Sequence, residues 1–261
     1  MRWTVISLTA VLAACSGNSS DHAGTQFAVH STHHMSKDLA GNYPAHAANE
    51  ARTFTTEGGT SVTLTKAYAV FESVELMACP QTAWQKFMHR LPMSLFVGHA
   101  FAHSEASPTK ISEPSVENIF SADLSARLLG SIEPPPGNYC ALRVTIGPAD
   151  FDTSNLPADV NMVGKSVYLQ GTTSAGDFTI AAVGLASRYV QDLAFDAPIN
   201  IQADGQNHSV VIGMNYSQWL NGLAFDSSEQ SHALATRVGT ALHLHHGIDV
   251  EDHTMEPEHH H

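Results

Sequence analysis

The chain has 261 residues, of which 25 are acidic and 12 are lysine or arginine, so its formal net charge is −13. This balance argues against a general nucleic-acid-binding protein, which needs a basic face to meet phosphates. Only 14% of the residues are charged and 43% are hydrophobic, which excludes a disordered acidic polymer. The 17 histidines outnumber lysine and arginine together, and imidazole is the commonest metal ligand of proteins.

The first residues have the features of an export signal. Arg2 precedes an apolar run, residues 3–14, which is too short for a membrane-spanning helix of about 20 residues. The run ends in Leu-Ala-Ala-Cys15, which resembles the lipobox of bacterial lipoproteins with Cys15 as the acylated residue. The alternative is an ordinary secretory signal that happens to contain a cysteine. We expect residues 1–14 to be a signal peptide and Cys15 to carry a lipid anchor.

The residue after Cys15 also bears on location. It is Ser16 and not aspartate, which favours sorting to the outer membrane if the cell is Gram-negative. We therefore expect a protein of the bacterial cell envelope that is held by its lipid and faces the periplasm or the surface.

Two further cysteines remain, Cys79 and Cys140. In an oxidising compartment an even pair predicts a disulfide, which would close a loop of about 60 residues and stabilise the fold by about 4 kcal/mol. The alternative is a pair of soft metal ligands, but the chain lacks the C-x-x-C spacing typical of such sites.

Residues 15–50 are polar and rich in small side chains, and no apolar period runs through them. We expect a flexible tether between the membrane and the folded domain. This segment contains the five histidines His22, His30, His33, His34 and His46.

Alternating apolar and polar residues dominate residues 51–226, and turns rich in Gly, Pro and Asp separate the alternating runs. The pattern predicts an antiparallel β-sandwich of the immunoglobulin or transthyretin-like kind. Gly58-Gly59 and the tetrapeptide 204–207 are typical hairpin turns, and the proline-rich segment 133–137 predicts a stiff corner. The expected strands are 53–56, 61–76, 125–132, 139–146, 166–172, 177–186, 189–195, 199–203 and 208–214.

Helical spacing occurs in two places. Apolar residues at 84, 87, 88 and 91 predict a short helix near 82–91, and residues 228–245 predict a C-terminal helix that ends before Gly247. The final region, 227–261, would then consist of this helix and a tail of histidines and acidic residues. The last three histidines could be native or belong to an expression tag.

Known catalytic motifs are absent, among them G-x-S-x-G, H-E-x-x-H, the P-loop and G-x-G-x-x-G. We therefore expect a protein that is not an enzyme.

Two histidine groups fall where a folded site could form. His99 and His103 share one face of either a helix or a strand, and His243, His245 and His246 form the densest cluster outside the termini. His243 and His245 share a face only if their segment is extended. Each group could instead be surface or frayed-end polar residues. If these five histidines are ligands, an all-imidazole set indicates copper or zinc as cofactor and not calcium or magnesium.

Three segments of the body resemble the MbnP-like secreted proteins. They are the strand Val62–Leu76, the corner and strand Pro135–Pro148, and the later pattern Ile199-Asn-Ile, Val210-Val-Ile and Trp219-Leu-Asn-Gly222. The resemblance implies a periplasmic β-sandwich associated with copper and a di-haem peroxidase-like partner. The four-cysteine pattern of that family is not met, since only Cys79 and Cys140 follow Cys15.

Together these features predict an exported, lipid-anchored protein that binds copper or zinc and does not bind nucleic acid. One alternative is a structural or adhesive β-sandwich of the cell envelope that binds a protein or glycan without metal. A second alternative is a hydrolase with a convergent site, in which a serine or aspartate lies beside a buried histidine.

Overall fold

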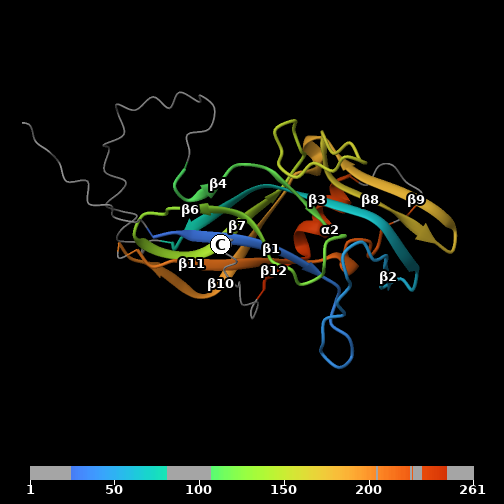
Figure 1. The fold of residues 1–261 in the computed structure, drawn as a ribbon, viewed down its shortest axis with the longest axis horizontal. Coiled ribbons are helices and arrows are strands. Elements are labelled where there is room, and N and C mark those ends of the chain that lie inside the picture. The colour runs from blue at the N-terminus through green and yellow to red at the C-terminus, as the bar shows by residue number, and fades with distance from the viewer. Residues whose placement is uncertain (1–24, 81–106, 204, 224, 226–230, 246–261) are drawn as a thin grey trace, which may run out of the picture.

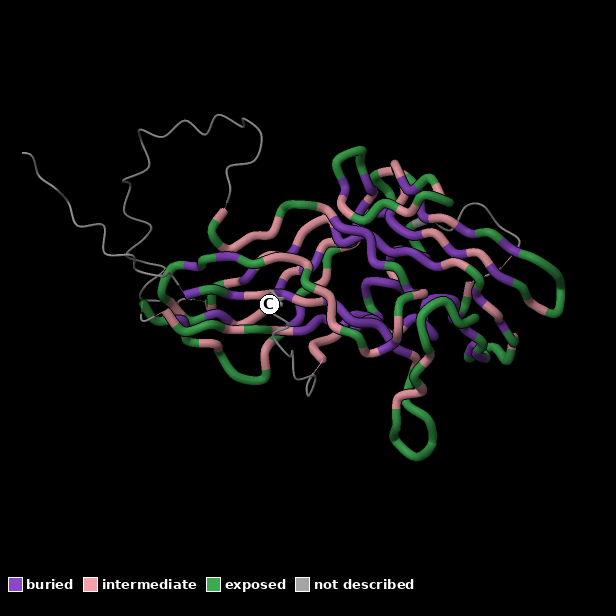
Figure 2. The backbone as a smooth tube through the Cα atoms, in the orientation of Figure 1, coloured by how far each residue is buried: buried purple, intermediate pink, exposed green. Residues whose placement is uncertain are grey.

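Two β-sheets form most of the protein (Figure 1). The structure is a computed structural model, and it describes residues 25–80, 107–203, 205–223, 225 and 231–245. One sheet has four strands and the other has eight. They face each other across a shared apolar core, which confirms the predicted β-sandwich. Figure 2 shows buried backbone running through both sheets, whereas the loops at their ends are exposed.

The small sheet has the strand order β12-β11-β1-β6. Its central pair, β1 and β11, is parallel, and its other two pairs are antiparallel. The predicted antiparallel arrangement therefore holds for every ladder of the described strands except this one. The strands are β12 (Leu242–Leu244), β11 (His208–Asn215), β1 (Phe27–His34) and β6 (Arg127–Ile132).

Strand β1 lies inside the segment that we expected to be a flexible tether. The prediction for residues 15–50 is wrong over Phe27–His34, because this stretch pairs with a strand on each side. Phe27 and Val29 are fully buried in the core, and Ser31 and His33 are buried on the same face of the strand. The sandwich thus begins before residue 51 and, since β12 belongs to it, continues beyond residue 226.

The large sheet has the order β10-β7-β3-β8-β9, and three short strands also pair with β3. Its long central strand β3 shifts register against β8 between Leu64 and Lys66, as at a β-bulge. The strands of the main path are β10 (Tyr189–Ile201), β7 (Gly137–Ile146), β3 (Ser61–Ala78), β8 (Lys165–Thr173) and β9 (Gly176–Val183). The short ones are β2 (Arg52–Thr55), β4 (Lys110–Ile111) and β5 (Ser115–Asn118).

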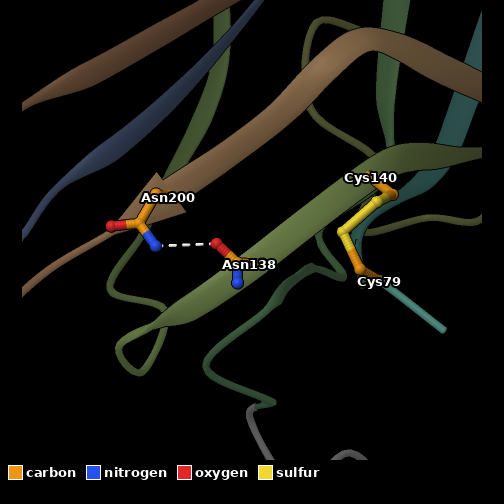
Figure 3. The surroundings of a disulfide bond; sticks show 4 residues. All are labelled: Cys79, Asn138, Cys140 and Asn200. Atoms are coloured by element: carbon orange, nitrogen blue, oxygen red, sulfur yellow. Dashed lines mark hydrogen bonds between the residues drawn. A yellow bond between two sulfur atoms is a disulfide. The ribbon is translucent and has the colours of Figure 1, made fainter. Parts of the chain in front are cut away.

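A disulfide joins the end of β3 to β7, as Figure 3 shows. Its cysteines are Cys79 and Cys140, which confirms the predicted pairing. Close by, Asn200 Nδ2 donates to Asn138 Oδ1 at 2.7 Å and so links β10 to β7. Both links lie at the same end of the large sheet.

The chain crosses between the sheets at two predicted turns. The proline corner at 133–137 leads from β6 in the small sheet to β7 in the large one. The turn at 204–207 connects β10 to β11, and these strands also belong to different sheets. The predicted hairpin at this turn is therefore wrong: β10 pairs with β7, and β11 pairs with β1 and β12. A turn-forming sequence specifies a reversal of direction, and the partner of each strand depends on the rest of the fold.

The C-terminal helix is shorter than predicted. Helix α2 (Ser231–Thr240) ends at Thr240, and β12 begins at Leu242 and pairs with β11. Leu234, Ala235 and Val238 of the helix are fully buried in the core. Gly239 is required by packing, since a Cβ built on it would lie 1.9 Å from Tyr189 Cδ1.

Two short 3-10 helices, η1 (Leu185–Ser187) and η2 (Tyr216–Gln218), complete the elements. Among the described residues no helix has the length and apolar character needed to cross a membrane. The helix predicted near 82–91 lies outside the described residues.

Candidate metal centre

The candidate site lies on the outer face of the small sheet. Side chains of β1 alternate, so Phe27 and Val29 point into the core and Thr32 and His34 point to the opposite face. His243 of β12 lies on this outer face too, because its neighbours Leu242 and Leu244 pack against the core. Thr32 is nevertheless fully buried and His34 is 2% exposed, so this part of the outer face is covered.

Three imidazoles converge there. They belong to His34 at the end of β1, His243 in the middle of β12 and His245 just after β12, and one ring nitrogen of each lies within 4.8 Å of the other two. His34 Nε2 lies 3.1 Å from His243 Nε2. The backbone N–H of His245 donates to the Val211 carbonyl at 2.9 Å, which holds this residue to the edge of the sheet.

A glycine allows His243 to reach His34 across the intervening strand. His243 pairs with Gly213 of β11, and Gly213 pairs with Thr32 of β1. A Cβ on Gly213 would lie 2.6 Å from His243 Nε2, a distance that real Cβ atoms essentially never show. The ring of His243 therefore occupies the space above Gly213.

The orientation of His34 suits a ligand. Its Nδ1 donates to the Met35 carbonyl at 2.6 Å, which leaves the lone pair on Nε2 directed toward His243. The pKa of His34 is lowered to about 4, chiefly by burial and also by the nearby His243 and His245, whereas the bond to Met35 and the charge of Asp123 oppose the shift. His34 is consequently neutral at pH 7, which is the form that binds a metal.

An aromatic ring closes one side of the cluster. The Tyr43 ring lies 4.3 Å from that of His34 and 5.4 Å from that of His245, measured between centroids. Lys37 Nζ lies 4.8 Å from the Tyr43 centroid on the same loop. This loop follows β1 and protrudes from the sheets in Figure 1, and its tip is exposed in Figure 2.

A separate polar cluster is buried behind the site, between the sheets. His33 Nδ1 bonds Glu117 Oε1 at 3.2 Å, and its Nε2 lies 3.5 Å from Asp123 Oδ1. Asp123 also accepts from Tyr216 at 2.9 Å and bonds His46 Nδ1 at 2.9 Å. The two nitrogens of His33 thus contact different carboxylates, so this cluster joins elements and does not direct its donors at one point.

The site contains only part of the predicted ligand set. Two of the predicted ligands, His243 and His245, lie close together, because their segment is extended and not part of the helix predicted over 228–245. His99, His103, His246 and the lipidation residue Cys15 lie outside the described residues. His34 is a new member that we had assigned to the tether. The sequence signal for the strand that carries His34 was the pair of apolar residues Phe27 and Val29 at alternate positions. The polar residues that follow them interrupted the apolar pattern.

The three histidines fit a transition metal by their chemistry. Nitrogen ligands bind zinc at about 2.0–2.1 Å, which places them about 3.3 Å apart in a tetrahedral site. The distance between His34 and His243 already meets this value, and the widest separation of 4.8 Å requires His245 to close by about 1.5 Å through side-chain rotation. Three imidazoles without a carboxylate favour copper or zinc over magnesium or calcium.

Comparisons with known proteins add little to this description. Neither a scan against family models nor a search of curated proteins found a match. Among solved structures, MbnP from Methylosinus trichosporium is similar to 79% of this chain over 80% of its own length, with 12% sequence identity and a TM-score of 0.37. At this identity and TM-score we draw no conclusion about function from the likeness.

Proposed function

We propose that this protein binds one transition-metal ion, copper or zinc, through His34, His243 and His245. The observation that carries the proposal is the convergence of three ring nitrogens within 4.8 Å of one another. Residues distant in the sequence supply these nitrogens from two chain segments separated by β11, and a glycine on β11 leaves room for the His243 ring. A chance surface cluster of histidines needs neither the glycine nor a buried, oriented His34.

Copper is the metal we favour over zinc. Imidazole suits both ions, and divalent copper generally binds nitrogen sites more tightly than zinc. The sequence resemblance to MbnP-like proteins points to copper as well. We further propose that the protein is exported and lipid-anchored at Cys15 in the cell envelope, and that it acts without catalysis, with a di-haem peroxidase-like protein as partner. The signal sequence, the absence of catalytic motifs and the same resemblance support these parts.

Equilibrium dialysis tests the metal site. The chain should bind one Cu or Zn ion with sub-micromolar affinity, and replacing His34, His243 and His245 together with alanine should remove this tight site. A matched control replaces His30, His208 and His232, three imidazoles that lie outside the cluster, and should retain it. If the unaltered chain binds no stoichiometric metal, or if both triple variants lose it equally, the proposal is wrong and a metal-free structural or adhesive role is favoured.

A further inference from the structure

One buried polar atom near the three histidines, Thr32 Oγ1, is not among the proposed metal ligands. The Thr32 side chain is fully buried, and its Oγ1 has no hydrogen-bond partner in the described part of the chain. A buried hydroxyl without a hydrogen-bond partner destabilises the fold, so such groups are uncommon unless a ligand or water meets them.

Thr32 lies on the same face of the small sheet as the three imidazoles. It pairs with Gly213, which pairs with His243, so the Thr32 side chain points to the same face as the His243 ring. Paired strands are about 4.8 Å apart, and the Cβ position of Gly213 is 2.6 Å from His243 Nε2. His34 follows two residues later on the same face, so the position of Thr32 lies next to those of two of the three ligands.

We infer that Thr32 is a positioning residue for a fourth, exchangeable ligand of the metal, an inference that rests on the proposed metal site. Three protein ligands leave one position of a tetrahedral ion for a molecule from solution, whereas closed structural sites use four protein ligands. The Thr32 hydroxyl hydrogen lacks an acceptor in the described residues, so it donates to that ligand. The fourth position therefore takes a small molecule that accepts a hydrogen bond, such as water or a monovalent anion.

Cobalt and azide provide the test. The full chain is loaded with Co(II), whose visible spectrum distinguishes a tetrahedral site from loosely bound ions, and is titrated with azide. Thr32→Val keeps the shape but removes the hydroxyl, and it should bind Co(II) as before while azide affinity falls about tenfold to a hundredfold. Thr32→Ser keeps the hydroxyl and should retain azide affinity within a few-fold. Thr32→Ala, which introduces no new contact, should behave like Thr32→Val.

The outcomes separate this inference from the proposed function. If the unaltered chain shows no tetrahedral Co(II) spectrum, the metal site itself is refuted and the role of Thr32 is refuted with it. If Co(II) binds but azide affinity is the same in the unaltered chain, Thr32→Val and Thr32→Ala, the metal site stands and Thr32 has no part in ligand binding.

Discussion

At the scale of single residues, Gly213 decides where His243 can lie. The His243 ring occupies the space that a side chain on β11 would fill, and the backbone of β11 separates the two strands that supply the ligands. An alanine at this position has no conformational difficulty of its own in a strand. Its methyl group acts only by displacing the imidazole.

Gly213→Ala should therefore weaken metal binding by about ten- to a hundredfold, the usual effect of disturbing the support of a ligand. Gly58→Ala is the control, since its Cβ would come no closer than 3.9 Å to another atom. The measurement is the dissociation constant for Zn or Cu by competition with a chelator. An affinity unchanged in Gly213→Ala would mean that His243 is not a ligand.

The low pKa of His34 makes stability depend on pH. Its pKa is about 4 in the folded protein, chiefly through burial, against an ordinary value of 6.5. Between pH 6.5 and 4 the His34 imidazole binds a proton in the unfolded chain but stays neutral in the folded one. The metal-free protein should therefore lose stability as the pH falls from 6.5 to 4. In His34→Gln this dependence should be weaker, as measured by urea unfolding at several pH values. Parallel curves for both proteins would contradict the assignment.

At the scale of elements, β1 is a strand of the small sheet that is joined to the large sheet through polar groups. Its inner face starts apolar and continues with Ser31 and His33, which both bond Glu117 of β5 in the large sheet. Arg127 of the neighbouring strand β6 also donates to Glu117 at 2.6 Å. Burial raises the pKa of Glu117, but the bond from His33 and the charge of Arg127 outweigh it and hold the pKa below its ordinary value.

Glu117→Gln should destabilise the fold by about 3 kcal/mol, because it leaves Arg127 without its buried counter-charge. The control is Asp192→Asn, which breaks an exposed pair with Arg143 and should cause a much smaller loss. Urea unfolding of the three proteins at pH 7 measures the difference. Equal stabilities of the two variants would show that Glu117 does not hold the sheets together.

At the scale of the whole molecule, the disulfide constrains the long excursion between β3 and β7. Cys79 and Cys140 are separated by 61 positions, and the loop that they close includes β4, β5 and β6. Strand β5 carries Glu117, and β6 borders β1 in the small sheet. The disulfide reduces the conformational entropy of the unfolded chain over these strands. It therefore favours both the formation of the polar cluster and the pairing of β1 with β6.

Replacing both cysteines with alanine should lower the free energy of unfolding by about 4 kcal/mol, because the unfolded chain regains the entropy of the closed loop. The measurement is urea unfolding of the variant beside the oxidised protein. Treatment of the unaltered protein with a reductant should produce a similar loss. No loss in either experiment would mean that the link adds no stability.

The sequence predicted elements well where one face is apolar throughout. The strands β3, β7, β8 and β11 were found near their observed limits, since apolar residues recur at alternate positions along much of each strand. It failed at β1, where buried Ser31 and His33 resemble an exposed polar segment. Their burial depends on Glu117, more than 80 positions away, and a local pattern does not contain that partner.

The sequence by itself determined the β-rich class, the cysteine pair and the high supply of imidazole. Only the tertiary structure decided which imidazoles meet. His243 and His245 share a face because their segment is extended where it pairs with β11. His34 lies close to them because β1 pairs with the other side of β11, parallel to it. The physical reason is that side-chain alternation and turn preference act over a few residues, whereas a three-histidine site depends on strand order and register between segments about 200 positions apart.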